Sequence, residues 1–125
     1  MGRKRVRLAI VGPCASGKST LAERLRRRGL EVHTPAQEHS GAPSMWQRFT
    51  RPDVLVYLDA ANHELRRRRP GASLTDDFLA RERRRLAHAR AHAHLRVDTT
   101  HLTPDEVADL VWAWLRTRGF VDANS

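Results

Sequence analysis

The feature that most constrains this chain is a glycine-rich motif set between a short apolar run and an amphipathic segment. Residues 12–19 read G-P-C-A-S-G-K-S and match the pattern G-x-x-x-x-G-K-[ST]. The run before it, residues 7–11, predicts a short buried strand, and apolar residues recur at helical spacing over residues 18–28. A strand, a tight loop and a helix in this order form the context that the pattern requires. The chain is therefore predicted to begin with a strand–loop–helix unit.

The residue types of this motif are those that a phosphate-binding loop requires. Gly12 and Gly17 let the backbone turn tightly, so that N–H groups converge on a bound phosphate, and the N-terminus of the following helix adds partial positive charge. Lys18 is placed to reach the β- and γ-phosphates, and the Ser19 hydroxyl is placed on Mg²⁺. We therefore expect a nucleoside triphosphate, taken as ATP, and Mg²⁺ as cofactors. The predicted nucleotide-binding residues are Gly12, Pro13, Cys14, Ala15, Ser16, Gly17, Lys18, Ser19 and Thr20.

Length and charge narrow the class of protein. A chain of 125 residues with a hydrophobic fraction of 40% predicts a single folded domain over residues 1–125. The formal net charge of +9 keeps a nucleic-acid partner open, but the arginines cluster without interleaved aromatic residues, which favours solvent-facing helix surfaces. The single cysteine excludes an internal disulfide. Because the first apolar stretch is too short for a signal peptide or a membrane span, we expect a cytoplasmic monomer or homodimer without a membrane partner.

The rest of the chain alternates strand and helix patterns. Further strands are predicted at residues 30–34, 53–59 and 95–99, and helices at about 63–69, 75–92 and 104–118. Asn62 is predicted to cap the second helix and Thr75 the third, and T-P-D-E at residues 103–106 predicts a capping box. Val107, Leu110, Val111 and Trp114 are predicted as the buried stripe of the last helix. Such alternation predicts an α/β fold with a parallel sheet of roughly four strands and helices on both faces.

A triphosphate site also needs an acidic group that holds the Mg²⁺ shell or accepts a proton. Asp59 ends an apolar strand, and Glu38 follows the second strand in a polar cluster. The carboxyl ends of parallel strands converge on the ligand crevice, so both residues are candidates and the sequence alone does not rank them. The pair His88 and His92 has helical spacing, but it is interpreted as surface because no cysteine or well-spaced acid joins it.

The order of these motifs resembles that of a known superfamily. The phosphate loop is followed by Q-E-H-S at 37–40, M-W-Q-R at 45–48, P-D-V-L-V-Y-L-D at 52–59, an arginine-rich hairpin, and a D-T strand before a T-P-x-E helix. This order is similar to that of the deoxynucleoside, thymidylate, shikimate and adenylylsulfate kinases. The quoted segments look most like compact bacterial ATP-binding proteins of unassigned substrate. The resemblance spans residues 8–115 and implies a three-layer P-loop NTPase fold.

The resemblance also implies roles for particular residues. By position it gives Glu38 the proton-accepting or metal-associated role and makes residues 65–85 a lid whose arginines, above all Arg67, Arg68, Arg69 and Arg81, close on the phosphates. His39 stands where those kinases have arginine, and residues 98–101 match the loop along adenine. The chain lacks an extra strand and helix that form much of the acceptor pocket in such kinases. The acceptor is therefore expected to be small, to sit against residues 45–49, or to be bound partly by a partner chain.

The resulting expectation is a phosphotransferase that moves the γ-phosphoryl group of MgATP to a small-molecule or nucleotide acceptor. The expected catalytic residues are Lys18, Glu38, Arg67 and Arg81, and the expected metal-associated residues are Ser19, Glu38 and Asp59. Two alternatives stay open: a nucleotide-dependent ATPase or switch without an acceptor, and a nucleic-acid-associated protein or nucleic-acid-end kinase.

Overall fold

The computed structural model describes residues 6–35 and 52–122 of the chain. Its strands are β1 (Arg7–Val11), β2 (Glu31–His33), β3 (Val54–Asp59) and β4 (Leu95–Asp98). Its helices are α1 (Lys18–Arg27), α3 (Asn62–Arg68), α4 (Asp76–Arg85), α5 (Ala87–His92) and α6 (Pro104–Thr117). All four predicted strands form within one or two residues of their expected bounds.

The strands form one parallel sheet in the order β2-β1-β3-β4. In the central pair Ala9 lies opposite Leu55, and at the outer pair Tyr57 lies opposite Arg96. Residues 54–58 of β3 are all buried, because a parallel strand with helices on both sides has no solvent-facing side chains. The predicted α/β fold with a parallel sheet of about four strands is confirmed.

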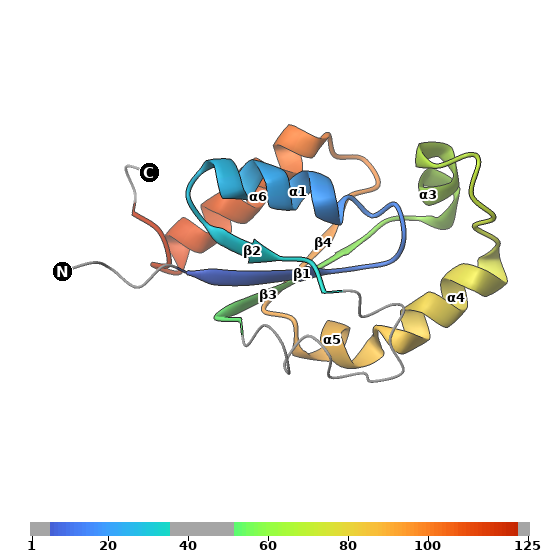
Figure 1. Ribbon diagram of the computed structural model, residues 1–125, viewed down its shortest axis with the longest axis horizontal. Coiled ribbons are helices and arrows are strands. Elements are labelled where there is room, and N and C mark those ends of the chain that lie inside the picture. The colour runs from blue at the N-terminus through green and yellow to red at the C-terminus, as the bar shows by residue number, and fades with distance from the viewer. Residues whose placement is uncertain (1–5, 36–51, 123–125) are drawn as a thin grey trace.

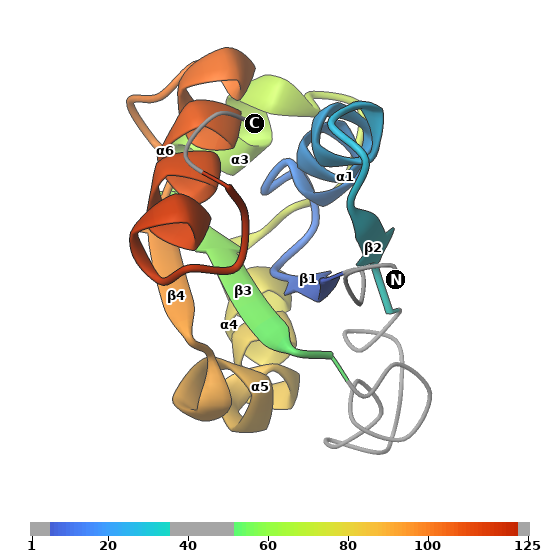
Figure 2. The same cartoon turned by 90° about the vertical axis from the view of Figure 1, so that its left-hand side faces the viewer.

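Helices cover both faces of this sheet, giving three layers. Figure 1 shows α1 and α6 on one face and α4 and α5 on the other, and Figure 2 shows the same layers from the side. The larger core packs α1 and α6 against the sheet, with Leu25, Val111 and Leu115 fully buried. The smaller core packs Leu86 and Ala89 against Tyr57 and its neighbours on β1 and β3. Figure 1 also shows α3 beyond the carboxyl ends of the strands, at the edge where strand-end side chains converge.

The predicted helix over residues 75–92 is divided. Helix α4 ends at Arg85 and α5 begins at Ala87, and Leu86 between them has φ −89° and ψ −2°. The backbone N–H of Leu86 still donates to Glu82, and the Leu86 carbonyl accepts from Arg90. Because Leu86 and Ala89 both stay buried against the sheet, the hydrophobic spacing continues across the break and does not reveal it.

The predicted buried stripe of the last helix is only partly right. Val107 and Val111 are buried, but Leu110 is 39% exposed and Trp114 is half-buried. Ala108, Trp112 and Leu115 take the inner positions instead. The guanidinium of Arg28 on α1 lies 5.0 Å from the ring centroid of Trp112, so this ring is held between the core and a cation.

Two of the three predicted caps form. The Thr75 hydroxyl accepts from the N–H of Phe78, and Thr103 and Glu106 make the complete capping box. The Asn62 cap is wrong: Ala61 precedes α3, and the Asn62 side chain bonds to Asp76 and Arg83 on α4. None of the helices in the two described ranges is long and apolar enough to cross a membrane.

Candidate functional site

The loop between β1 and α1, residues 12–17, passes close beneath the end of β3. A Cβ atom at Gly12 would lie 2.3 Å from the Leu58 carbonyl oxygen and 2.6 Å from Ser16 Oγ, so no larger residue fits there. Gly17 has φ 102°, in the left-handed region that glycine adopts without strain, and Ala15 has φ 68°. The backbone path therefore requires glycine at both positions of the motif.

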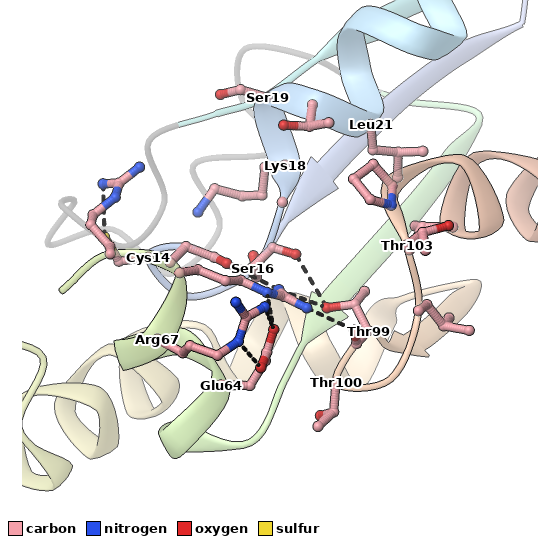
Figure 3. Close-up of a pocket in the computed structure, with 18 of the residues that line it drawn as sticks. Cys14, Ser16, Lys18, Ser19, Leu21, Glu64, Arg67, Thr99, Thr100 and Thr103 are labelled. Atoms are coloured by element: carbon pink, nitrogen blue, oxygen red, sulfur yellow. Dashed lines mark hydrogen bonds and ion pairs between the residues drawn. The ribbon is translucent and has the colours of Figure 1, made fainter.

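Lys18, the first residue of α1, turns its side chain back over this loop. Its Nζ donates to the carbonyl of Gly12 at 2.6 Å and to the carbonyl of Pro13 at 3.2 Å. The ammonium group is thereby held beside the loop backbone rather than extended into solvent, as Figure 3 shows. A positive charge and the N-terminus of a ten-residue helix meet at the same end of the loop.

The loop forms one wall of a cavity of about 850 Å³. Figure 3 shows that α3 supplies a second wall and that the segment after β4 supplies a third. The lining residues are Cys14 to Leu21, Glu64, Arg67, Arg68, Arg69, Thr99 to Pro104, and Val107. A cavity of this size suits a small-molecule ligand. We call it the loop cavity.

Three consecutive arginines of α3 and its end line the loop cavity. Arg67 makes two hydrogen bonds to the Glu64 carboxylate, at 2.8 and 2.6 Å, yet its own side chain is 72% exposed. These bonds, opposed by partial burial and helped by Arg68, lower the pKa of Glu64 to about 2. The Arg69 guanidinium lies 3.2 Å from Cys14 Sγ. This wall therefore presents fixed positive charge to the loop.

Arg68 ties three parts of the site together. Its guanidinium donates to the Ala15 carbonyl at 3.2 Å, to the Thr99 carbonyl at 2.7 Å and to Glu64 at 2.9 Å. Thr99 follows β4 and is itself 2% exposed, so Arg68 joins α3, the loop and the β4 end through the backbone carbonyls of Ala15 and Thr99. Of the predicted lid arginines, Arg68 therefore connects α3 to two other segments, whereas the hydrogen bonds of Arg67 go to Glu64 on its own helix.

The structure adds one residue that the sequence did not single out. The Glu82 carboxylate on α4 is 3% exposed, and its Oε1 accepts a hydrogen bond from the Cys14 N–H at 3.1 Å. Its Oε2 is buried and has no hydrogen-bond partner among the described residues. The sequence signal was present, because Glu82 falls on the apolar stripe of α4, where a charged residue requires a specific partner.

Other predicted residues lie elsewhere. Asp59 is ion-paired with Arg83 at 3.0 Å and lines a separate cavity, while its carbonyl accepts from the Thr99 N–H. Arg81 is exposed and is not among the residues that line the loop cavity, so the structure does not bring it together with Arg67. Within α4, Arg83 is the arginine that reaches the end of β3. Ser19 is exposed and lines the loop cavity.

Some expectations fall beyond the described ranges. Glu38, with the rest of residues 37–40, lies outside them, as do residues 45–49. Within the described ranges, no group of three or more His, Cys, Asp or Glu side chains is arranged to hold a metal ion. His88 and His92 stack with ring centroids 4.2 Å apart, and His92 is exposed.

Comparison with known proteins does not identify a related site. No protein-family model matches the chain, and no curated protein matches it significantly. The function must therefore be inferred from the residues of the site and the motifs of the sequence.

Proposed function

We propose that this chain is a small P-loop kinase that binds MgATP in the loop cavity and transfers the γ-phosphoryl group to a small-molecule or nucleotide acceptor. The observation that carries the proposal is one arrangement: a constrained glycine loop with Lys18 above it opens into an 850 Å³ cavity whose opposite wall is lined by Arg67, Arg68 and Arg69. Phosphoryl transfer depends mainly on positioning and on neutralising negative charge, and this arrangement supplies both.

The loop and α1 would hold the phosphates. The first N–H groups of a helix have no partners within the helix, and the residues at the start of α1 line the loop cavity. Lys18 would exchange its two carbonyl contacts for the β- and γ-phosphate oxygens. Ser19, exposed at the same place, would bind Mg²⁺ through its hydroxyl.

The arginine wall would neutralise charge during transfer. Arg67 is exposed toward the cavity, so its guanidinium can turn from Glu64 to a phosphate oxygen without unpacking the core. Glu64 keeps its bond to Arg68 when Arg67 leaves it. Charge stabilisation of this kind is commonly worth a factor of about 10²–10³ in rate.

The segment after β4 would lie along the base. Residues 99–104 form the third wall of the loop cavity and lead into α6. This wall includes residues 99–101, which belong to the segment 98–101 that the resemblance gives the adenine-loop role. Glu38 remains the proposed proton acceptor or metal-associated residue, whereas Asp59 is paired with Arg83 and does not line the loop cavity.

The test is Mg²⁺-dependent release of ADP from ATP by the purified chain, with and without a pool of nucleosides, nucleotides and small metabolites. Lys18→Ala is the inactivating variant. Arg27→Ala is the matched control, because it removes one cation from the same helix, where Arg27 makes an exposed ion pair with Glu23. We expect stimulation by the pool in the wild type and in Arg27→Ala, and none in Lys18→Ala.

Two outcomes contradict the kinase proposal. Lys18-dependent ADP release that no pool stimulates favours the ATPase or switch alternative. Binding of a polynucleotide that weakens steeply with salt, with phosphate transferred to its ends, favours the nucleic-acid alternative.

A further inference from the structure

A second cavity, of about 460 Å³, lies on the face of the sheet that carries α4 and α5. Tyr57 of β3 lines it, and Arg96 lies opposite Tyr57 in the neighbouring strand β4. Because side chains of paired residues point to the same face of a sheet, both lie on the α5 side. Arg83 of α4 and Arg90 of α5 line the remaining wall. This cavity, which we call the tyrosine cavity, shares no lining residue with the loop cavity.

The Tyr57 hydroxyl is the least satisfied group of the tyrosine cavity. The residue is 1% exposed, and its hydroxyl has no hydrogen-bond partner among the described residues. Burial, reinforced by the nearby Asp59, raises the pKa of Tyr57 to about 12, so the hydroxyl carries its proton at neutral pH and can donate it. A buried hydroxyl without an acceptor is energetically unfavourable, so a group that accepts this hydrogen bond is stabilised there.

The arginines around it are not equally available. Arg83 is bound to Asp59, at 3.0 and 3.1 Å, and Arg96 donates to the backbone carbonyls of Arg90 and Ala91. By contrast, the Arg90 guanidinium has no hydrogen bond or ion pair with any residue in the described ranges. Three guanidinium groups and the Asp59 carboxylate leave the cavity with a net charge of plus two.

We propose that the tyrosine cavity is a binding site for a small oxyanion, the phosphate or carboxylate group of a metabolite. The Tyr57 hydroxyl donates a hydrogen bond to the anion, and the Arg90 guanidinium supplies the principal opposite charge. Arg83 and Arg96 keep the cavity basic while their own contacts hold α4, α5 and β4 around it. The site is separate from nucleotide binding and stands whether or not the loop cavity performs phosphoryl transfer.

The test uses the fact that Tyr57 is the single tyrosine of the chain. Full-length protein labelled with ¹³C at tyrosine Cζ gives one NMR reporter signal at the proposed site. It is titrated with inorganic phosphate in one series and with succinate in another, which separates a phosphate preference from a carboxylate preference. We expect a saturable shift of the signal with at least one of the two anions.

Three variants test whether the anion binds in the tyrosine cavity. Arg90→Ala should weaken the anion affinity at least tenfold. The fold should tolerate this change, because the Arg90 side chain is exposed and its backbone carbonyl still accepts from Arg96. Arg84→Ala, which removes an exposed arginine of α4 that lines neither cavity, should leave it unchanged, and so should Lys18→Ala. The proposal is overturned by the absence of a saturable shift with both anions. It is also overturned if Arg84→Ala weakens binding as much as Arg90→Ala, or if Lys18→Ala abolishes the shift.

Discussion

The Glu82 carboxylate accepts a hydrogen bond from the backbone N–H of Cys14 at 3.1 Å, across 68 residues of sequence. This contact places a negative side chain directly behind a loop that we propose to bind phosphate. One N–H of the loop is therefore directed to the protein rather than to a ligand. The hydrogen bond from Cys14 to Glu82 orders the loop, but the negative charge of Glu82 weakens the attraction of the loop for anions.

The first prediction follows from that conflict of charge. Glu82→Gln keeps an oxygen that can accept from the Cys14 N–H but removes the negative charge. At an effective dielectric constant of about 20, a unit charge acts on another about 10 Å away with about 1.7 kcal/mol, before screening by Mg²⁺. We expect the variant to bind ATP about fivefold more tightly, measured by isothermal titration calorimetry.

Glu23→Gln is the control for Glu82→Gln, because it neutralises an exposed carboxylate of α1 that is paired with Arg27. Its ATP affinity should stay within about twofold of the wild type, since exposed charges are well screened. If Glu82→Gln binds ATP no more tightly than Glu23→Gln while its unfolding midpoint is preserved, the negative charge of Glu82 does not act on the loop site.

The second prediction concerns the close approach of Gly12 to β3. Gly12→Ala would place Cβ within 2.3 Å of the Leu58 carbonyl oxygen, and the central strand β3 cannot move away without disturbing both cores. Overpacking of this kind costs about 1–3 kcal/mol, and we expect a loss at the upper end of that range. Urea unfolding at neutral pH measures it.

Gly71→Ala is the matched control for this substitution. Gly71 has open space around the position of an added Cβ and does not have a left-handed φ. Its unfolding free energy should change by less than about 1 kcal/mol in either direction. Equal losses in the two variants would show that the Leu58 contact does not set the requirement for glycine.

Much of the fold follows from the sequence alone. The apolar run at residues 54–58, the capping box at Thr103 and the strand before the glycine loop are local signals, and each predicted its element. The break at Leu86 was missed because the hydrophobic spacing continues across it, and the exposure of Leu110 was missed because it depends on which neighbours α6 packs against. The spacing of apolar residues shows that a helix has a buried face, but it does not fix which residues lie at the centre of that face.

The site was predictable to a lesser degree. The loop cavity is lined by Arg67 and by the predicted nucleotide-binding residues from Cys14 to Thr20, but not by Gly12 or Pro13. The contact of the Glu82 carboxylate with the Cys14 N–H and the pairing of Asp59 with Arg83 were not foreseen, because both join a side chain of α4 to a residue far away in the sequence. No spacing rule within one element encodes such a contact.

The third prediction separates two adjacent arginines. Arg67→Ala removes a cation that is 72% exposed and should cost less stability than Arg68→Ala, because Glu64 keeps its hydrogen bond to Arg68. If Arg67 neutralises the transferring phosphoryl group, the same variant should lower Mg²⁺-dependent ADP release about 100-fold. Arg68→Ala leaves the Ala15 carbonyl without its donor and removes one of the two donors to the Thr99 carbonyl, which also accepts from the Leu102 N–H. It should cost about 3 kcal/mol of stability.

The role of Arg67 is decided by comparing the two variants in both stability and ADP release. Urea unfolding and ADP release are measured on the same preparations. If Arg67→Ala destabilises the protein as much as Arg68→Ala, its role is structural, and if its ADP release equals that of the wild type, Arg67 does not act on the phosphates.

The fourth prediction is a pH dependence that arises at Glu64. The folded protein lowers the pKa of Glu64 from 4.5 to about 2 through its bonds to Arg67 and Arg68. A carboxyl whose pKa falls on folding stabilises the folded state fully above its unfolded pKa and loses that contribution as the pH falls toward the folded value. Glu64 should therefore stabilise the protein above about pH 4.5 and progressively less toward pH 2.

Glu64→Gln has no group that titrates in this range, so the comparison isolates Glu64 from the other carboxylates. Urea unfolding of both proteins at pH 6, 4.5, 3.5 and 3, at constant salt, should show the wild type more stable at pH 6 and the difference shrinking below pH 4.5. Glu23→Gln, which breaks an exposed ion pair with Arg27, should show a smaller difference at pH 6. A difference between wild type and Glu64→Gln that is the same at pH 6 and pH 3 would mean that the arginines stabilise the Glu64 side chain by packing and not by pairing with its charge.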